Sequence, residues 1–92
     1  MKPIRLSQHA QSRALLRGAT EAEVAACVEQ SPASPAEKGR WSARKTFLFN
    51  ALSPVNRRLY RFKTVEAIFV EEPLEIVVVT IKVYYSNEEM VV

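Results

Sequence analysis

His9, Arg13 and Arg17 are the residues of this chain whose types and spacing most clearly suggest chemistry. Each is four positions from the next, so a helix would align all three in one row on its surface. Histidine can take or give a proton near neutral pH, and arginine binds phosphate. Such a row can act as a base among cations that bind an anion, or it can be an ordinary solvated helix face.

The residues on either side of this row predict the helix that holds it. Ser7 suits the N-cap, where its hydroxyl accepts a backbone N–H of the first turn. Gly18 suits the left-handed position that follows a helix. We therefore predict a short helix over residues 8–17, with Ala10 and Ala14 on a flanking face that docks on a core.

The composition argues against several other kinds of active site. The chain has no Asp, one His and one Cys, and no cluster with the spacing of zinc or calcium ligands. It has no G-x-S-x-G motif and only two glycines, too few for a glycine-rich phosphate loop. We therefore predict no metal and no cofactor. RNA cleavage through its own 2′-OH fits this composition, since it needs only a base, an acid and cations.

Positive charge is concentrated in the first two-thirds of the chain. Residues 1–63 hold 12 of the 13 Lys and Arg and 4 of the 10 Glu, a net charge of +8, whereas residues 64–92 carry −5. A basic surface suits RNA or an acidic partner protein, although charges spread over a solvated surface would give the same count.

Cations lie beside aromatic residues in the middle of the chain, a pattern that single-stranded nucleic acid uses for phosphates and bases. The aromatic residues, Trp41 and Tyr60, suit a core at least as well. Thr80 and Lys82 interrupt an otherwise aliphatic strand, where they could line a groove. The predicted RNA-binding residues are Arg17, Arg40, Lys45, Arg58, Arg61 and Lys82.

The rest of the chain predicts an α+β fold. Thr20 and Glu23 form a capping-box pattern that begins a second helix, and Pro32 and Pro35 end it. Strand patterns follow over residues 41–50, 57–63, 66–71 and 75–85. We therefore predict two N-terminal helices packed on a four-stranded antiparallel sheet.

Alternation along these strands predicts which residues share a face. One face of residues 57–63 is strongly basic, with Arg57, Arg61 and Lys63. The last strand has one wholly apolar face, which predicts that it is central and packs on the helices. That face consists of Val77, Val79, Ile81 and Val83.

Length and composition fit one domain over residues 1–92, with an ordered core at about residues 6–85 and a loose tail after it. No signal peptide or membrane-length apolar run is visible, which predicts a cytoplasmic protein that does not enter a membrane. The single cysteine, Cys27, excludes an internal disulfide and suits the core. The long apolar strand could bury a dimer contact, but no residue requires a dimer.

Two stretches carry a family resemblance. One is H-A-x-x-R-x-x-x-R-G, from His9 to Gly18, and the other is I-F-V-E-E-P-L-E-I-V-V-V-T-I-K-V-Y-Y, from Ile68 to Tyr85. Together they resemble a family of small bacterial proteins of unknown function placed near the RelE and BrnT ribonuclease toxins. The resemblance is weak over residues 32–54. It implies a RelE-like fold and a metal-independent endoribonuclease, with recurring polar positions at His9, Arg13, Arg17 and Thr80.

We therefore predict a toxin-like endoribonuclease of a toxin–antitoxin pair, with RNA as substrate and an acidic antitoxin as partner. Its predicted catalytic residues are His9, Arg13 and Thr80. One alternative is a non-catalytic module that docks nucleic acid or an acidic protein. Another is that the row on the first helix is structural and ties that helix to the sheet. A shared site with Thr80 requires the helix to lie at the edge of the sheet.

Overall fold

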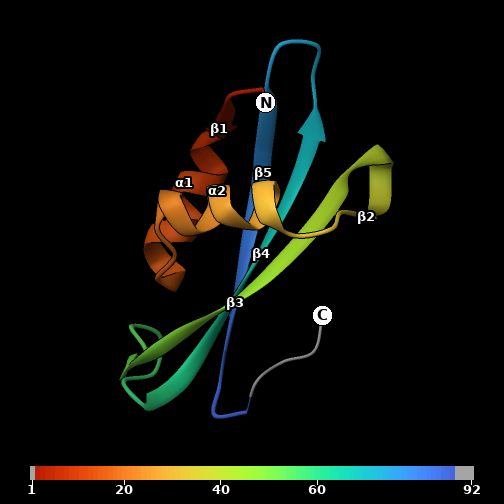
Figure 1. The fold of residues 1–92 in the computed structure, drawn as a ribbon. Coiled ribbons are helices and arrows are strands. Elements are labelled where there is room, and N and C mark those ends of the chain that lie inside the picture. Colours follow the sequence, from red (N-terminus) through yellow and green to blue (C-terminus); the bar gives the residue numbers. More distant parts are fainter. Residues whose placement is uncertain (1, 89–92) are drawn as a thin grey trace.

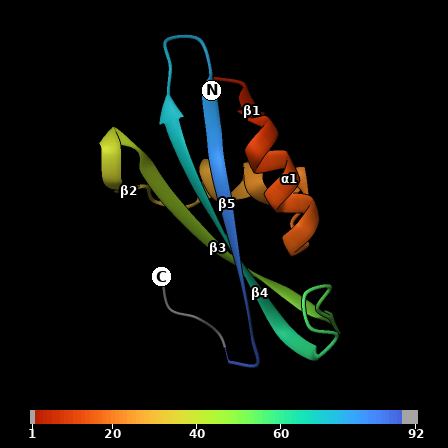
Figure 2. The same ribbon diagram turned by 180° about the vertical axis from the view of Figure 1, so that it is seen from behind.

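The computed structural model describes residues 2–88, which form two α-helices and a five-stranded mixed sheet. The elements in chain order are β1 (Ile4–Leu6), α1 (Gln8–Arg17), α2 (Glu21–Gln30), β2 (Ser34–Pro35), the short 3-10 helix η1 (Glu37–Gly39), β3 (Trp41–Leu52), β4 (Leu59–Glu71) and β5 (Ile76–Ser86). The strand order is β1-β5-β4-β3-β2, and β1 runs parallel to β5. Both helices cover one face of the sheet (Figures 1 and 2).

Both helices begin and end where the sequence predicts. The Ser7 side chain accepts the N–H of Ala10, and Gly18 follows α1 with a φ of 85°. Thr20 and Glu23 form the predicted capping box at the start of α2. These predictions are confirmed because capping depends on residues three or four positions apart, which a sequence displays directly.

The predicted sheet of four antiparallel strands is wrong. The two strands predicted over residues 57–63 and 66–71 form one continuous strand, β4, because Thr64 and Val65 keep the pairing with β3 and β5. No Gly, Pro, Asn or Asp stands between Lys63 and Glu66, so nothing there favours a turn. β4 and not the last strand is central. β1 and β2 add one short strand at each edge, and both are too short to produce a periodic pattern.

A β-bulge in β5 changes which of its residues face the helices. The pairing of β4 with β5 shifts by one residue between Ile68 and Phe69, which leaves Val79 without a position of its own opposite β4. One extra residue exchanges the two faces of a strand. The predicted apolar face is therefore correct after the bulge, where Ile81 lies in the core and Val83 packs against it, and wrong before the bulge, where the core residues are Ile76 and Val78.

The core lies between the helices and the sheet. Ala10 of α1 and Val24 of α2 are fully buried there, together with Val65 of β4. Cys27 is also fully buried, as predicted, and burial raises the pKa of its thiol to about 11. Burying each side chain of valine size contributes about 1.5–3 kcal/mol, so this layer fixes the helices on one face of the sheet.

The basic face predicted over residues 57–63 does not form. Lys63 is only 5% exposed, and its Nζ lies 2.9 Å from Glu23 Oε1 and 2.9 Å from the carbonyl oxygen of Gly18. It lies on the helix-covered side, where it joins the start of α2 to β4. Arg57 lies in the loop before β4. Of the three predicted cations, Arg61 is the one exposed on the strand.

No helix within residues 2–88 is long and apolar enough to cross a membrane. β5 continues to Ser86, and the last four residues of the predicted loose tail lie outside the described residues.

Candidate functional site

α1 lies along the edge of β5, as a shared site requires. β1 pairs with β5 only as far as Val78. From Val78 onward, Ser7 and α1 border β5 in place of a strand. Ser7 donates its N–H to Val78 O at 2.9 Å and its hydroxyl to Val79 O at 3.3 Å, and Arg17 Nη1 donates to Ile81 O at 2.8 Å. The residues of α1 therefore border the stretch of β5 that contains Thr80.

The row of His9, Arg13 and Arg17 divides into two parts. Arg17 is half-buried, and its guanidinium binds the β5 backbone at Ile81. Arg17 therefore fits the structural alternative, in which the row ties α1 to the sheet. His9 is exposed, and its Nε2 lies 3.5 Å from Arg13 Nε. Within residues 2–88, neither His9 nor Arg13 forms an ion pair.

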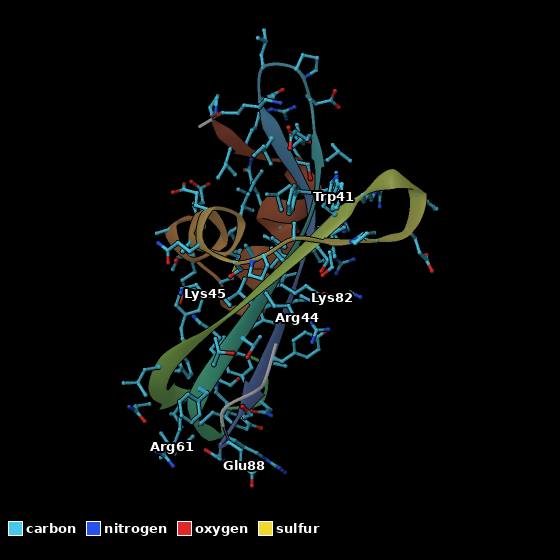
Figure 3. The ribbon with its side chains drawn as sticks, turned by 45° about the vertical axis from the view of Figure 1, so that its right-hand side comes forward. Trp41, Arg44, Lys45, Arg61, Lys82 and Glu88 are labelled. Carbon is cyan, nitrogen blue, oxygen red and sulfur yellow. The ribbon has the colours of Figure 1, made fainter. Side chains whose placement is uncertain are left out.

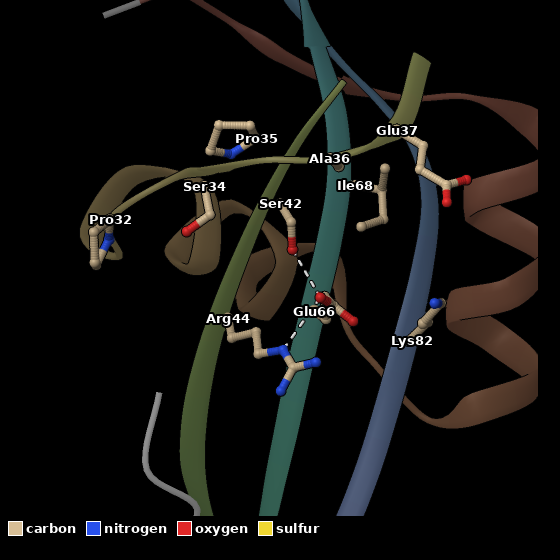
Figure 4. Close-up of a pocket in the computed structure, with 10 residues that line it drawn as sticks. All are labelled: Pro32, Ser34, Pro35, Ala36, Glu37, Ser42, Arg44, Glu66, Ile68 and Lys82. Carbon is tan, nitrogen blue, oxygen red and sulfur yellow. Dashed lines mark hydrogen bonds and ion pairs between the residues drawn. The ribbon is translucent and has the colours of Figure 1, made fainter. Parts of the chain in front are cut away.

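The sheet face that the helices leave uncovered carries a polar row at its centre. Arg44, Glu66 and Lys82 are register partners on β3, β4 and β5. The Glu66 carboxylate is only 7% exposed. It accepts hydrogen bonds from Ser42 Oγ at 2.7 Å and Arg44 Nε at 3.1 Å (Figure 4). It also accepts one from Tyr84 OH at 3.2 Å.

These contacts keep Glu66 ionised. Burial alone would raise the pKa of this carboxyl, but the hydrogen bonds from Ser42 and Arg44 outweigh burial and lower it. Burial and the neighbouring Glu66 charge raise the pKa of Tyr84. Because its pKa is lowered, the Glu66 carboxylate stays ionised near neutral pH and serves as an acceptor that holds Arg44 and Tyr84 in place. The Arg44 guanidinium lies 5.3 Å from the centre of the Tyr84 ring.

A groove runs between this face and the segment that contains β2 and η1. One part, about 610 Å³ in volume, lies over Glu66 and is lined by Ser34, Glu37, Ser42, Arg44 and Lys82 among others. A second part, about 340 Å³, shares Glu37 and Lys82 and extends along β5. Thr80 and Arg40 line this second part. The structure thus brings together one predicted catalytic residue, Thr80, and two predicted RNA-binding residues, Arg40 and Lys82.

The other four predicted RNA-binding residues do not line this groove, and one of them is Arg17 on α1. Lys45 pairs across the sheet with the core residue Val65, so it belongs to the helix-covered side. Arg58 lies in the loop between β3 and β4. Arg61 lies five residues from Glu66 along β4, about 16 Å away, near the far end of the sheet (Figure 3).

The row on α1 and the groove meet around the edge of β5. The positive charge of Arg17 acts on the hydroxyl of Tyr84, a residue of the uncovered face, and partly offsets the rise in its pKa. Lys82 lies on β5, the long strand nearest α1, and lines the groove (Figure 4). His9 and Arg13 therefore lie on one side of this strand edge, with Thr80 and Lys82 on the other. We call this combined area the β5-edge surface.

The sequence does not predict Ser42, Glu66 or Tyr84 as site residues. One feature of the sequence could have indicated Glu66. It is a carboxylate inside an apolar run, and a buried charge requires partners. Its partner Arg44 stands 22 residues earlier in the chain. Only the strand register identifies that partner, and the register depends on the whole sheet.

Within residues 2–88, no three His, Cys or Glu side chains come together as metal ligands. No family model, curated protein or solved structure matches the chain. The resemblance to the RelE and BrnT neighbourhood therefore remains a prediction.

Proposed function

We propose that this protein binds RNA on the β5-edge surface and cleaves it as a toxin-like, metal-independent endoribonuclease. The observation that supports this most is the position of α1. Because the helix replaces a strand along β5, His9 and Arg13 lie beside the strand that carries Thr80 and Lys82. An RNA strand that follows this edge would contact both groups.

The charges of this surface support RNA as the ligand. Arg13, Arg40 and Lys82 form no ion pair among residues 2–88. Lys63, in contrast, is buried and paired with Glu23. Cations without a carboxylate partner pay no cost of breaking an ion pair when they bind phosphate, and binding releases counterions from the RNA.

The chemistry assigned to this surface is transesterification. His9 takes the proton of a ribose 2′-OH, and the 2′ oxygen attacks the adjacent phosphorus. The bond to the 5′ oxygen breaks, which leaves a 2′,3′-cyclic phosphate, and Lys82 or water protonates the departing oxygen. Arg13 stabilises the charge that develops on the phosphate, and Thr80 donates a hydrogen bond to it. An acidic antitoxin is the proposed partner that restrains this activity.

A second candidate function is RNA binding without cleavage. The Glu66 network favours it, because the carboxylate stays ionised and the pKa of Tyr84 is raised. The groove then offers cations beside an ionised carboxylate to which Tyr84 donates, and neither Glu66 nor Tyr84 is suited to exchange a proton near neutral pH. On this view His9 is a surface residue and does no chemistry.

One experiment on labelled single-stranded RNA in the presence of EDTA distinguishes the two candidate functions. Cleavage by the wild type to a cyclic phosphate product, lost in His9→Ala but kept in Ser12→Ala, would support the ribonuclease. Ser12 lies on the same helix and is exposed, so it is a matched control. Binding without product would support the second candidate. Absence of binding would contradict both.

A further inference from the structure

The two long edges of the sheet differ in how far their backbone groups are paired. Along β5, β1 pairs with the first residues, and Ser7 and Arg17 then bond to backbone carbonyls. Along β3, β2 pairs only with Trp41 and Ser42. No other described strand adjoins β3 on that side, so residues 43–52 have no strand partner there, and we call them the free strand edge.

A free edge offers alternating N–H and C=O groups that another extended chain can pair with. The exposed leucines of β3 add apolar contacts, since Leu48 is 72% exposed and Leu52 is 58% exposed. The pairing of β3 with β4 shifts between Leu48 and Ala51, and such a bulge interrupts the regular edge. The regular part of the free edge is therefore residues 43–48.

The charge around this edge selects the kind of chain that fits it. No Glu or Asp occurs between Lys38 and Val65. Lys45 of the edge strand and Arg57 and Arg58 of the adjoining loop form no ion pair with any described residue. Two copies of this edge would bring like charges together, which disfavours edge-to-edge pairing of the protein with itself. RNA has no backbone that matches alternating N–H and C=O groups.

We propose that residues 43–48 of β3 bind an acidic, extended segment of a partner protein as an added strand. Backbone hydrogen bonds would supply affinity, Leu48 an apolar contact, and Lys45 the preference for carboxylates. This surface is on the opposite edge from the β5-edge surface. The inference gives the acidic partner of the proposed function a binding site and rests on that part of it, but the test below requires neither RNA binding nor cleavage.

The test uses a fluorescent peptide of about eight residues in which glutamate and valine alternate. Backbone amide hydrogen exchange of the whole chain is measured with and without the peptide, and affinity is measured by polarisation. We expect slower exchange within residues 43–48. We also expect affinity to fall about tenfold or more in Leu48→Glu and in Lys45→Glu, because like charges then face the peptide.

The matched control is Leu15→Glu, since Leu15 is also an exposed leucine but lies on α1. It should bind the peptide as the wild type does. A peptide methylated on alternate backbone nitrogens should fail to bind, because it lacks the donors of an added strand. Equal binding by that peptide, slowed exchange only at the β5-edge surface, or residues 43–48 already protected by self-association would each overturn the proposal.

Discussion

Glu66 is the residue on which the uncovered face of the sheet depends. Its carboxylate accepts from Ser42, Arg44 and Tyr84, and these bonds lower its pKa although burial acts in the opposite direction. Removing the charge would leave the donors of two strands without their acceptor. The protein would then be less stable, and the residues that line the groove would be less well ordered.

We expect Glu66→Gln to lower the free energy of unfolding by about 1–3 kcal/mol at pH 7, because charge-assisted hydrogen bonds are lost. The pKa of Glu66 is lowered in the folded state, so its stabilisation is complete above the unfolded value of about 4.3 and is lost as the pH falls below it. Urea unfolding at several pH values should show the difference between wild type and variant shrinking in acid. Glu29→Gln, at an exposed position, is the control. A difference that persists at pH 2 would contradict this account.

Arg17 and Arg13 differ in role although both belong to the row on α1. Arg17 donates a hydrogen bond to Ile81 O, whereas the one hydrogen bond of the Arg13 side chain within residues 2–88 goes to His9. We expect Arg17→Ala to cost about 1–2 kcal/mol, a fall in Tm of several degrees, and Arg13→Ala to leave Tm nearly unchanged. Thermal unfolding of the two variants checks this. An equal fall in both would mean that the whole row is structural.

At the scale of elements, the junction of α1 and α2 joins the helices to the sheet. Tyr85 OH donates to Arg17 O at 2.6 Å, and Lys63 binds Gly18 O and Glu23. Gly18 has a φ of 85°, and a Cβ there would lie 2.6 Å from Tyr85 Oη and 2.7 Å from Pro54 Cγ. The junction therefore requires glycine for its conformation and for its lack of a side chain.

Gly18→Ala should be clearly more destabilising than Gly39→Ala. Both glycines have positive φ, so both substitutions cost about 1 kcal/mol in backbone strain, but a Cβ at Gly39 meets no atom within 4 Å. The excess at Gly18 comes from the contacts with Tyr85 and Pro54. Urea unfolding of the two variants measures it. Equal losses of stability would show that the junction tolerates a side chain.

The elements also show which features of the fold could be predicted from the sequence. The two helices were predictable because their caps, Ser7 and Thr20, act on neighbours in the chain. The sheet was not, because the bulge at Val79 and the parallel pairing of β1 depend on contacts between distant segments. For the same reason the sequence indicated Thr80 and Lys82 as site residues but not Glu66, whose role comes from partners on two other strands.

At the scale of the whole molecule, the sheet separates its surfaces. The helices cover one face, the groove occupies the other, α1 closes the β5 edge and the β3 edge stays open (Figure 1). Residues 1–63 carry a net positive charge. Two of these cations are Arg40, which lines the groove, and Arg13, which lies on α1 beside the β5 edge. RNA binding by such a surface must depend on salt, because each phosphate contact releases counterions.

We expect the logarithm of RNA affinity to fall linearly with the logarithm of salt concentration, and Arg40→Ala to reduce that slope by about one. Lys2→Ala is the control, since Lys2 pairs with Glu71. Fluorescence titrations with one single-stranded RNA over a range of salt concentrations give the slopes. A wild-type slope near zero would argue against phosphate contacts.

The most direct test of the β5-edge surface is the RNA affinity of Arg13→Ala and Lys82→Ala, measured in the same titration. These residues lie on different elements, α1 and β5, on the two sides of one strand edge. If one RNA strand crosses that edge, each variant should weaken binding several-fold, while Arg5→Ala, whose side chain is paired with Glu75, should not. Weakening by only one of the two, or by neither, would contradict a shared surface.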